Sequence, residues 1–312
     1  MSIRNKTLLA VLLCGVFGVA AADPEGGASN NGKTVRTGPS DAKPFGAGKA
    51  GLSFSLNNGG SWSKSINLDD GPVKYIRAKY QAPINGNDPY ANVDGTDNPQ
   101  YLRLGDVKPV IGWFYNPTLG QVWYENRHNN TEVYSVRQMA NPIIPGAPKF
   151  GGLVIAKVPG MGGSDGNVFF GEWAPRKGNP PDNSTDLNMA DGKRTVWYVG
   201  DNPTTNMPNL VNAQYNVLGV NKHTPGQNDF YTGVLTANYG TGSGSLTGTL
   251  SRPGDSVDFA GTNIRSDGTF NNGEHAADKI TGRFYGSGAE ALAGIVDRAG
   301  VDKDVAFGGR KQ

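Results

Sequence analysis

The chain has 312 residues, of which 29 are lysine or arginine and 27 are aspartate or glutamate, so its formal net charge is +2. A balance this close to neutral argues against nucleic acids and anionic membrane surfaces as partners. The 46 glycines follow no collagen period and fall at strand ends and turns, which is typical of all-β proteins. The length suits two domains of ordinary size.

Residues 1–22 have the pattern of a secretory signal peptide. Arg4 and Lys6 precede the apolar run TLLAVLLCGVFGVA, and three alanines then offer a small-residue cleavage site before Asp23. The run is too short for a membrane span. We therefore expect a secreted, extracellular protein. The mature chain would carry 27 basic residues (29 minus 2) against 27 acidic ones.

The single cysteine, Cys14, lies inside this segment. Leu13 stands before it, where the signal peptidase for lipoproteins requires a small residue, so we do not expect lipidation, although association with the cell surface stays open. The mature chain then has no thiol, and a hydrophobic core must stabilise it without disulfides.

Residues 23–50 contain few large apolar side chains, and Phe45 is the most prominent of them. A segment of this composition cannot offset the entropy of ordering it, so we expect a flexible leader. Residues 51–194 then show short runs rich in β-branched and aromatic residues, such as VKYIRAKY, QVWYENR, TEVYSV and NVFFGEWA, between clusters of turn residues. This pattern predicts a β-rich N-terminal domain.

Residues 195–312 predict a second, more regular β domain. About eight short strands end in turn signals, and Thr-Gly recurs between apolar residues in YTGVL, LTGTL and ITGRF. Glycine weakens a strand unless the backbone must bend or pass close to a neighbour, and a small closed barrel needs such bends. The final run VAFGG, which contains Phe307, would pair with the first strand and close the barrel. The expected fold class is therefore all-β, with an N-terminal β-rich domain and a C-terminal eight-stranded antiparallel barrel.

The C-terminal part also resembles a known family. The segments VWYVGDNPTTNMPNLVNAQYNVLGV, YTGVLTANYG, LTGTL, ITGRFYGSGAEALAGIVD and VAFGGRKQ resemble the barrel of transferrin-binding-protein-B-like proteins of Gram-negative bacteria. Together with NVFFGEWAP and the signal segment, they are most similar to the haemophilins, which are small secreted haemophores. This resemblance covers residues 196–312 and is weaker for the N-terminal half.

The resemblance implies a function and several partners. The N-terminal domain would be a handle that binds b-type haem non-covalently, and the haem would come from the host, with haemoglobin as one source. The haem would pass to a TonB-dependent outer-membrane receptor, a role connected with virulence, and a Slam-type exporter would recognise the barrel. Relatives with the same barrel bind host proteins, so a host-protein binder or colonisation factor without haem is the alternative.

Haem iron is held by His, Met, Tyr or Cys, which leaves few candidates here. His128 lies in QVWYENRHNNTEVYSV, at a predicted hairpin tip between two aromatic strands. The residues alone favour a solvated turn histidine; with the resemblance, we predict that it is the axial iron ligand. The predicted pocket walls and propionate partners beside it are Trp123, Tyr124, Tyr134, Arg127 and Arg137.

Other ligands are less favoured. His223 and His275 fall in polar loops and read as solvated turn residues, with His223 the better reserve. The sequence assigns no second axial ligand: Tyr124, Met139, Met161 and an open sixth position all remain possible.

The sequence does not point to an enzyme. It contains no H-E-x-x-H motif. A G-x-S-x-G elbow, a phosphate-binding loop and a dinucleotide-binding fingerprint each need a helix after the motif, and no window of the sequence shows a sustained helical period, so we expect none of these sites. We therefore expect a binding protein that has no enzymatic activity.

Overall fold

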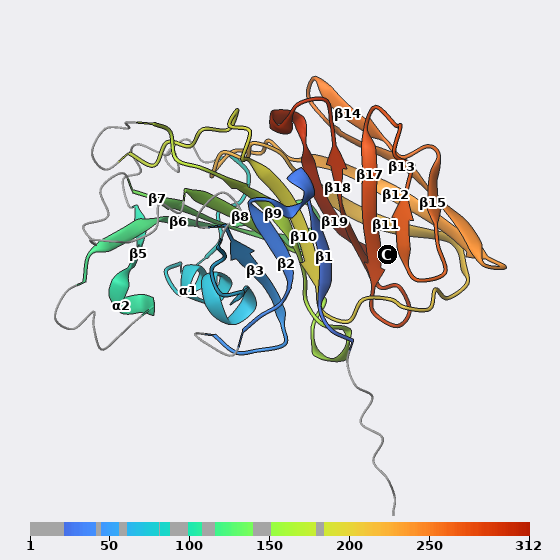
Figure 1. Cartoon of the computed structure of the whole chain (residues 1–312), viewed down its shortest axis with the longest axis horizontal. Helices are drawn as coiled ribbons and strands as arrows, with labels where there is room; N and C mark the ends of the chain where they lie inside the picture. The colour runs from blue at the N-terminus through green and yellow to red at the C-terminus, as the bar shows by residue number, and fades with distance from the viewer. Residues whose placement is uncertain are drawn as a thin grey trace, which may run out of the picture.

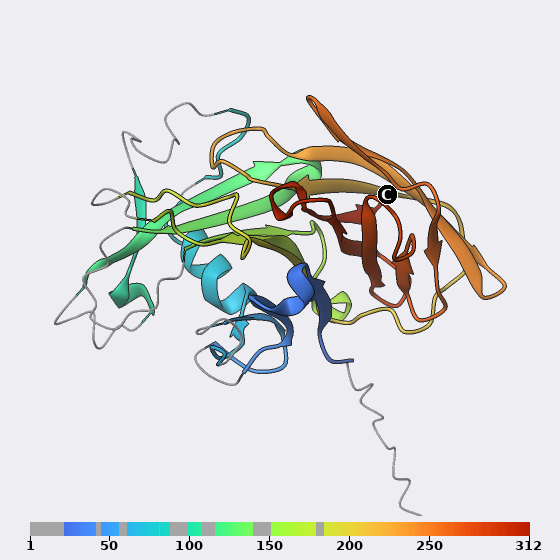
Figure 2. The ribbon, with the colours of Figure 1, turned by 45° about the horizontal axis from the view of Figure 1, so that its top comes forward.

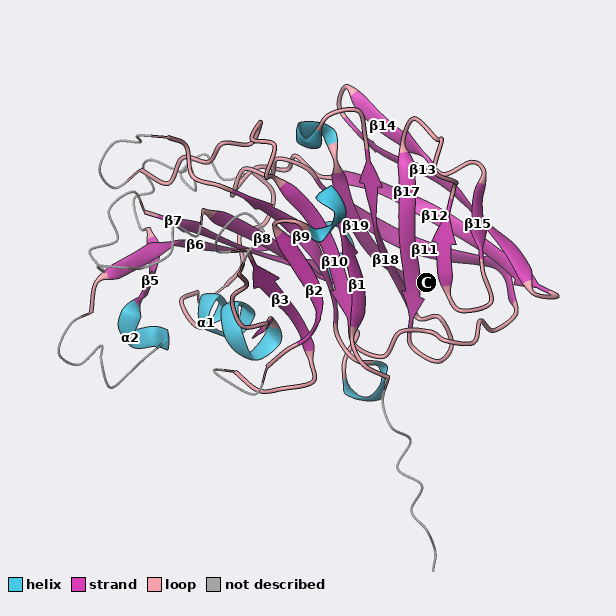
Figure 3. Cartoon of the chain, in the orientation of Figure 1, coloured by secondary structure: helices cyan, strands magenta, loops and turns pink. Residues whose placement is uncertain are grey.

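The structure, a computed structural model, describes residues 22–41, 45–55, 61–80, 82–87, 99–107, 116–139, 151–178 and 184–312. The predicted signal peptide lies outside these residues, apart from residue 22. The described chain forms three layers: a small N-terminal sheet with one helix, a seven-stranded sheet, and a β-barrel (Figures 1 and 2). Strands dominate and the helices are short, as Figure 3 shows, so the all-β prediction is confirmed.

The central layer is an antiparallel sheet in the order β1-β10-β9-β8-β7-β6-β5. Its strands are β1 (Glu25–Ala28), β5 (Gln100–Arg103), β6 (Thr118–Arg127), β7 (Thr131–Gln138), β8 (Gly152–Lys157), β9 (Val168–Ala174) and β10 (Thr195–Gly200). The short helix α2 (Leu104–Val107) follows β5. Strands β7 to β10 are nearly continuous runs of buried residues, because both faces of this sheet are covered.

One face of this sheet is covered by the small N-terminal layer. That layer contains β2 (Val35–Pro39), β3 (Ala50–Phe54), β4 (Ile66–Asn67), a π-helical turn at Asp69–Val73, and α1 (Lys74–Arg77). Leu52, Leu68 and Ile76 from this layer share one apolar cluster with Tyr134 and Trp197 of the central sheet.

The opposite face is covered by the barrel, whose strands pair in the closed circuit β12-β11-β19-β18-β17-β16-β15-β13-β12. The eight strands are β11 (Leu210–Val220), β12 (Tyr231–Gly240), β13 (Ser243–Arg252), β15 (Thr262–Ile264), β16 (Thr269–Asn271), β17 (Lys279–Tyr285), β18 (Ala291–Asp297) and β19 (Val305–Lys311). A ninth strand, β14 (Asp255–Asp258), pairs only with β13. The predicted eight-stranded barrel is thus confirmed.

The last strand closes the barrel as the sequence predicts. β19 pairs with β11 on one side and with β18 on the other, and Phe307 lies fully buried inside. Gly294 is the cross-strand partner of Phe307, and a Cβ atom at Gly294 would come within 2.6 Å of the Phe307 ring. Gly282 is likewise the cross-strand partner of Phe270, and a Cβ atom at Gly282 would collide with the Phe270 ring. The glycines in the strands therefore leave space for interior aromatic rings in a narrow barrel.

Small residues on the outside of the barrel allow the central sheet to approach it. Ala291, Ala293 and Ala306 of the barrel are buried in one cluster with Phe170 and Tyr198 of the sheet. A Cβ atom at Gly308 would come within 2.5 Å of the Phe170 ring, so only glycine fits at that barrel position. We call the central sheet, together with the small layer on its other face, the N-terminal module. This module and the barrel share a continuous apolar interface that is packed like the core of a domain.

Two sequence-based boundaries need correction. The predicted flexible leader, residues 23–50, contributes β1 and β2, and β1 pairs with β10 along its whole length. Strand β1 is ordered although it is polar, because its backbone hydrogen-bonds to β10. Gly26 and Gly27 have no side chains, so β1 can lie close to β10; a Cβ atom at Gly26 would collide with the Tyr198 carbonyl. The predicted barrel start at residue 195 is also too early, because β10 belongs to the central sheet and the barrel begins at Leu210.

Truncating Phe307 to alanine should strongly destabilise the protein. The ring fills the closure point of the barrel, and a Phe→Ala change in a core costs about 3–5 kcal/mol. Urea unfolding followed by tryptophan fluorescence measures this loss. The control is Thr249→Ala on the exposed face of β13, for which a change within about 0.5 kcal/mol is expected. Equal midpoints for the two variants would contradict the closure role of Phe307.

Candidate functional site

The predicted site residues lie on both faces of the hairpin formed by β6 and β7. Side chains alternate along a strand, so Tyr124 and Tyr134 face the small N-terminal layer, as members of its apolar cluster. Glu125 instead faces the barrel, where it bonds to His223. Trp123 and Arg127 are on this same barrel side, as they alternate with Tyr124 along β6. The six predicted residues therefore do not line one common pocket.

On the N-terminal side, the two tyrosines form a closed hydrogen-bonded unit. Their rings stack with centroids 5.0 Å apart and an interplanar angle of 8°. Each hydroxyl donates to one carboxylate oxygen of Glu132, at 2.8 Å in both cases, and Arg77 lies 3.5 Å from the same carboxylate. Burial and the Glu132 charge raise the pKa of both Tyr124 and Tyr134, which keeps the phenols protonated. Both phenols are therefore committed to Glu132.

On the barrel side, the two predicted arginines also have protein partners. Arg127 pairs with Glu125 and donates to the carbonyl of Gly86. Arg137 lies 6.0 Å from the ring centre of Trp123, and its Nη2 donates to the carbonyl oxygen of His223 at 3.0 Å. These guanidinium groups help to hold the hairpin against the barrel.

His128 is exposed at the tip of the hairpin. It begins a short 3-10 turn, His128–Asn130, in which Asn129 and Asn130 adopt positive φ angles of 55° and 60°. Asparagine tolerates this left-handed conformation well, which explains the tight turn between the strands. Within the described part of the chain, the His128 imidazole makes no hydrogen bond. Its role as an iron ligand stays a prediction.

His223 is buried, so the prediction of a solvated turn histidine was wrong. Its side chain is 1% exposed and stacks on Phe230 at 4.3 Å. Its Nε2 lies 2.7 Å from Glu125 Oε2, and its Nδ1 lies 2.6 Å from Asp229 Oδ1. Two carboxylates accept from one ring only when both ring nitrogens carry protons. Burial alone would lower the pKa of His223, but Glu125 and Asp229 outweigh this effect and raise the pKa to about 9.

A second buried carboxylate, Glu172 of β9, holds the same barrel loop. It accepts the backbone N–H groups of Lys222 and His223 at 2.9 and 2.7 Å, and it pairs with Arg194. Burial would raise the pKa of Glu172, but Arg194 and the two backbone donors lower it, so the carboxylate is charged. Arg194 also donates to the carbonyls of Val301 and Asp304 in the loop between β18 and β19.

We call residues 221–230, which connect β11 to β12, the clasp loop. Glu172 holds the start of this loop, and Glu125 holds its middle, because Glu125 accepts from the His223 ring and from the N–H of Gly226 at 2.9 Å. Sequence reasoning missed both carboxylates. Each nevertheless gives a signal, since a lone glutamate interrupts the aromatic strands VWYENR and FFGEWA, where a buried charge needs specific partners.

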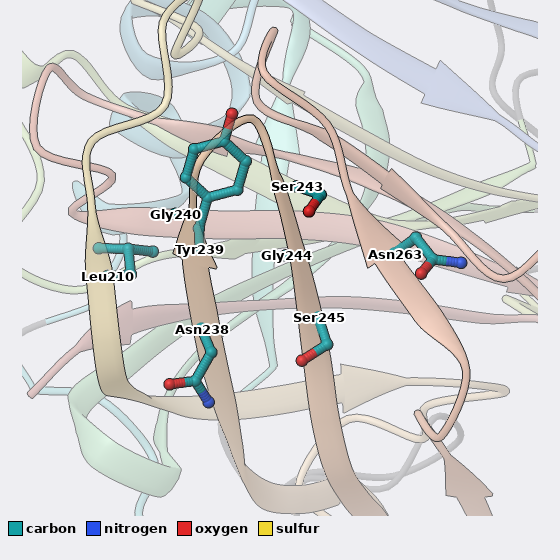
Figure 4. Close-up of a pocket in the computed structure, with 8 residues that line it drawn as sticks. All are labelled: Leu210, Asn238, Tyr239, Gly240, Ser243, Gly244, Ser245 and Asn263. Atoms are coloured by element: carbon teal, nitrogen blue, oxygen red, sulfur yellow. The ribbon is translucent and has the colours of Figure 1, made fainter.

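An open hollow of about 430 Å³ lies at the end of the β12–β13 hairpin (Figure 4). Its walls mix polar and apolar surface and carry no charged side chain; they are formed by Leu210, Asn238, Tyr239, Gly240, Ser243, Gly244, Ser245 and Asn263. The side chains of Asn238 and Asn263 point in different directions rather than toward one centre. The residues that line the hollow include no histidine and no basic side chain, so they offer no partner for propionates; Tyr239 is of a type that can bind haem iron.

Within the described ranges, no group of three or more His, Cys, Asp or Glu residues is arranged to hold a metal ion. A haem iron does not require such a group, since one axial imidazole can anchor it. Of the described helices, none combines the length and apolar character that a bilayer crossing demands.

Comparison with known proteins identifies a family whose domain resembles the barrel. Residues 205–311 match the family model of the HphA C-terminal domain, a haemophilin domain, and this range contains every barrel strand. The predicted resemblance of this part of the chain to the haemophilin-type barrels is thus confirmed.

Solved structures with weak similarity include a surface lipoprotein and two forms of Transferrin Binding Protein B. A surface lipoprotein is 16% identical and aligns over 46% of this chain and 76% of its own, with a TM-score of 0.31. A mutant of Transferrin Binding Protein B from Actinobacillus pleuropneumoniae H49 is 15% identical, over 63% and 100%, with a TM-score of 0.30. The isotype 1 protein of the same name from serogroup B Neisseria meningitidis is 12% identical, over 85% and 63%, with a TM-score of 0.26. Likenesses of this size carry no functional argument.

The charged His223 should cause the free energy of unfolding to fall as the pH becomes alkaline. Its folded-state pKa of about 9 lies above the usual 6.5, so its contribution is complete below about pH 6.5 and is lost as the pH rises through about 9. A shift of this size corresponds to about 3 kcal/mol. We expect wild type to lose more unfolding free energy than His223→Asn between pH 7 and 10, measured by urea unfolding at each pH. The exposed His275→Asn variant should follow wild type; parallel curves for wild type and His223→Asn would contradict the charged imidazole.

Proposed function

We propose that this protein is a secreted haem-binding protein that acquires haem from the host and passes it to an outer-membrane receptor. The match of residues 205–311 to the HphA C-terminal domain carries this proposal. Haemophilins and the transferrin-binding relatives are binding proteins rather than enzymes. The signal-peptide pattern of residues 1–22 supports an extracellular or cell-surface location.

The chain contains three histidines, and their environments favour His128 as the axial ligand. Iron binds a neutral imidazole nitrogen. Both nitrogens of His223 are engaged by carboxylates, and His275 is exposed in the loop between β16 and β17 of the barrel. His128 alone among the three is both unengaged within the described chain and located on the N-terminal module. An exposed, unengaged imidazole fits an axial ligand.

The bound group would be b-type haem held without covalent bonds. Covalent attachment through thioethers needs cysteines, and Cys14 lies within the predicted signal peptide. When bound, the haem supplies an iron centre that accepts the imidazole nitrogen. The position of His128 on an exposed tip suits transfer to a second protein, because a receptor can approach the ligand directly. Haemoglobin is the proposed source, a TonB-dependent receptor the proposed acceptor, and a Slam-type translocon the proposed exporter.

Replacing His128 with alanine should weaken haem binding at least about tenfold, which is about 1.4 kcal/mol. The reason is the loss of the iron–imidazole bond. Titration of purified full-length protein with haemin, followed by the Soret band, measures the affinity and reports the ligand. The matched control is His275→Ala, which should leave both the affinity and the Soret position unchanged.

Two results would contradict the proposal. A wild-type protein that shows no Soret shift with haemin does not bind haem, and a stable complex with a serum or tissue protein in a pull-down would then favour a host-protein binder. A His128→Ala variant with wild-type spectra would instead refute the assignment of the ligand.

A further inference from the structure

We propose that His223 is a positioning residue for the hairpin that carries His128, so that the barrel controls how firmly the N-terminal module holds its ligand. The clasp loop is the physical link between the two. The ligand-release part of this inference rests on the proposed haem function, whereas the positioning part does not.

The link begins at Glu125, three residues before His128 on β6. Its carboxylate is fully buried and accepts hydrogen bonds from three groups: His223 Nε2, the N–H of Gly226 and the guanidinium of Arg127. Two of these three donors come from the clasp loop of the barrel. The end of β6 is therefore fixed by a loop nearly a hundred residues away in the sequence.

The next barrel-facing residue extends this attachment to the tip. Arg127 directly precedes His128, and its guanidinium lies 5.6 Å from the ring centre of Phe230 in the clasp loop. The same guanidinium bonds to Glu125 and to the carbonyl of Gly86. The orientation of the turn at His128–Asn130 thus follows from contacts that His223 organises.

The charges around His223 come from four elements. Glu125 and Asp229 accept from its ring, and Arg127 lies beyond Glu125 on β6. Arg137 of β7 donates to its carbonyl, and Glu172 of β9 accepts from its N–H. The imidazolium is the group placed directly between Glu125 and Asp229. When the ring loses its charge, only one nitrogen still donates, so one of the two carboxylates loses its donor, and breaking such a buried pair is strongly unfavourable.

The test compares His223→Gln with wild type in the full-length protein. The glutamine amide can donate hydrogen bonds but cannot carry the positive charge that balances the two carboxylates. Haem dissociation into an excess of a haem-scavenging apoprotein, followed by stopped-flow absorbance at pH 7, should accelerate about tenfold, equal to about 1.4 kcal/mol. The Soret position should not move, because His128 remains the ligand. The control, His275→Gln, should dissociate at the wild-type rate.

The pH profile tests whether the proton of His223 governs ligand release. In wild type, haem dissociation should accelerate as the pH rises through about 9, since His223 then loses its proton. His223→Gln should lack this step. A profile with the same step in both proteins would overturn the proposal.

A second readout does not require haem. Amide hydrogen exchange in the haem-free protein should increase across residues 123–138 in His223→Gln, with the barrel strands β16 and β17 unchanged. If wild type binds no haem, the proposed function fails, while this measurement still decides the positioning role. Unchanged exchange in the hairpin overturns the inference.

Asp229→Asn provides a milder variant in case His223→Gln does not fold. Asp229 is partly exposed, at 29%, and its removal keeps the pair between His223 and Glu125. Exchange in the hairpin and haem dissociation should then increase in the same direction but by less. Wild-type values for both would overturn the proposal.

Discussion

The compensation of two buried carboxylates is the constraint on which the arrangement of this protein depends. Glu125 and Glu172 project from the central sheet into its interface with the barrel, where an unpaired charge would cost several kcal/mol. Their partners are supplied mainly by the clasp loop, through the His223 ring and the backbone N–H groups of residues 222, 223 and 226. Arg127 and Arg194 balance the two charges from the sheet side, so the hydrogen bonding of both carboxylates is complete only when the barrel is docked with this loop in place.

The barrel meets this requirement because its own geometry fixes where the clasp loop lies. The loop connects β11 and β12, and β11 also pairs with the last strand, β19. Barrel closure by Phe307 therefore determines the position of β11, and β11 determines the position of the loop. The small residues on the barrel exterior, such as Gly308 against Phe170, then let the sheet come close enough for the carboxylates to reach it. Apolar packing sets the distance between the modules, and the ionic contacts set their register.

The sequence predicted the barrel well and the interface poorly, for physical reasons. Barrel closure depends on local patterns, so the Thr-Gly strands and the final aromatic residue at 307 were informative. The partner of Glu125 is His223, which is 98 residues away, and no local pattern connects them. The strand β1 escaped notice because its stability comes from backbone pairing with β10, which composition does not report. Tyr124 and Trp123 were grouped by nearness in sequence, although neighbours on a strand face opposite sides of the sheet.

The environments of His128 and His223 differ, and this difference underlies the two roles that we propose for them. A ligand histidine must present a neutral nitrogen to the metal, so it must remain free of strong acceptors. His128 meets this condition on an exposed turn, whereas His223 is held as a cation by two carboxylates and cannot coordinate iron. The cation is nevertheless what fixes the base of the hairpin that ends in His128. The two proposed roles therefore need two separate imidazoles, because one ring cannot offer a free nitrogen to iron while both of its nitrogens donate to carboxylates.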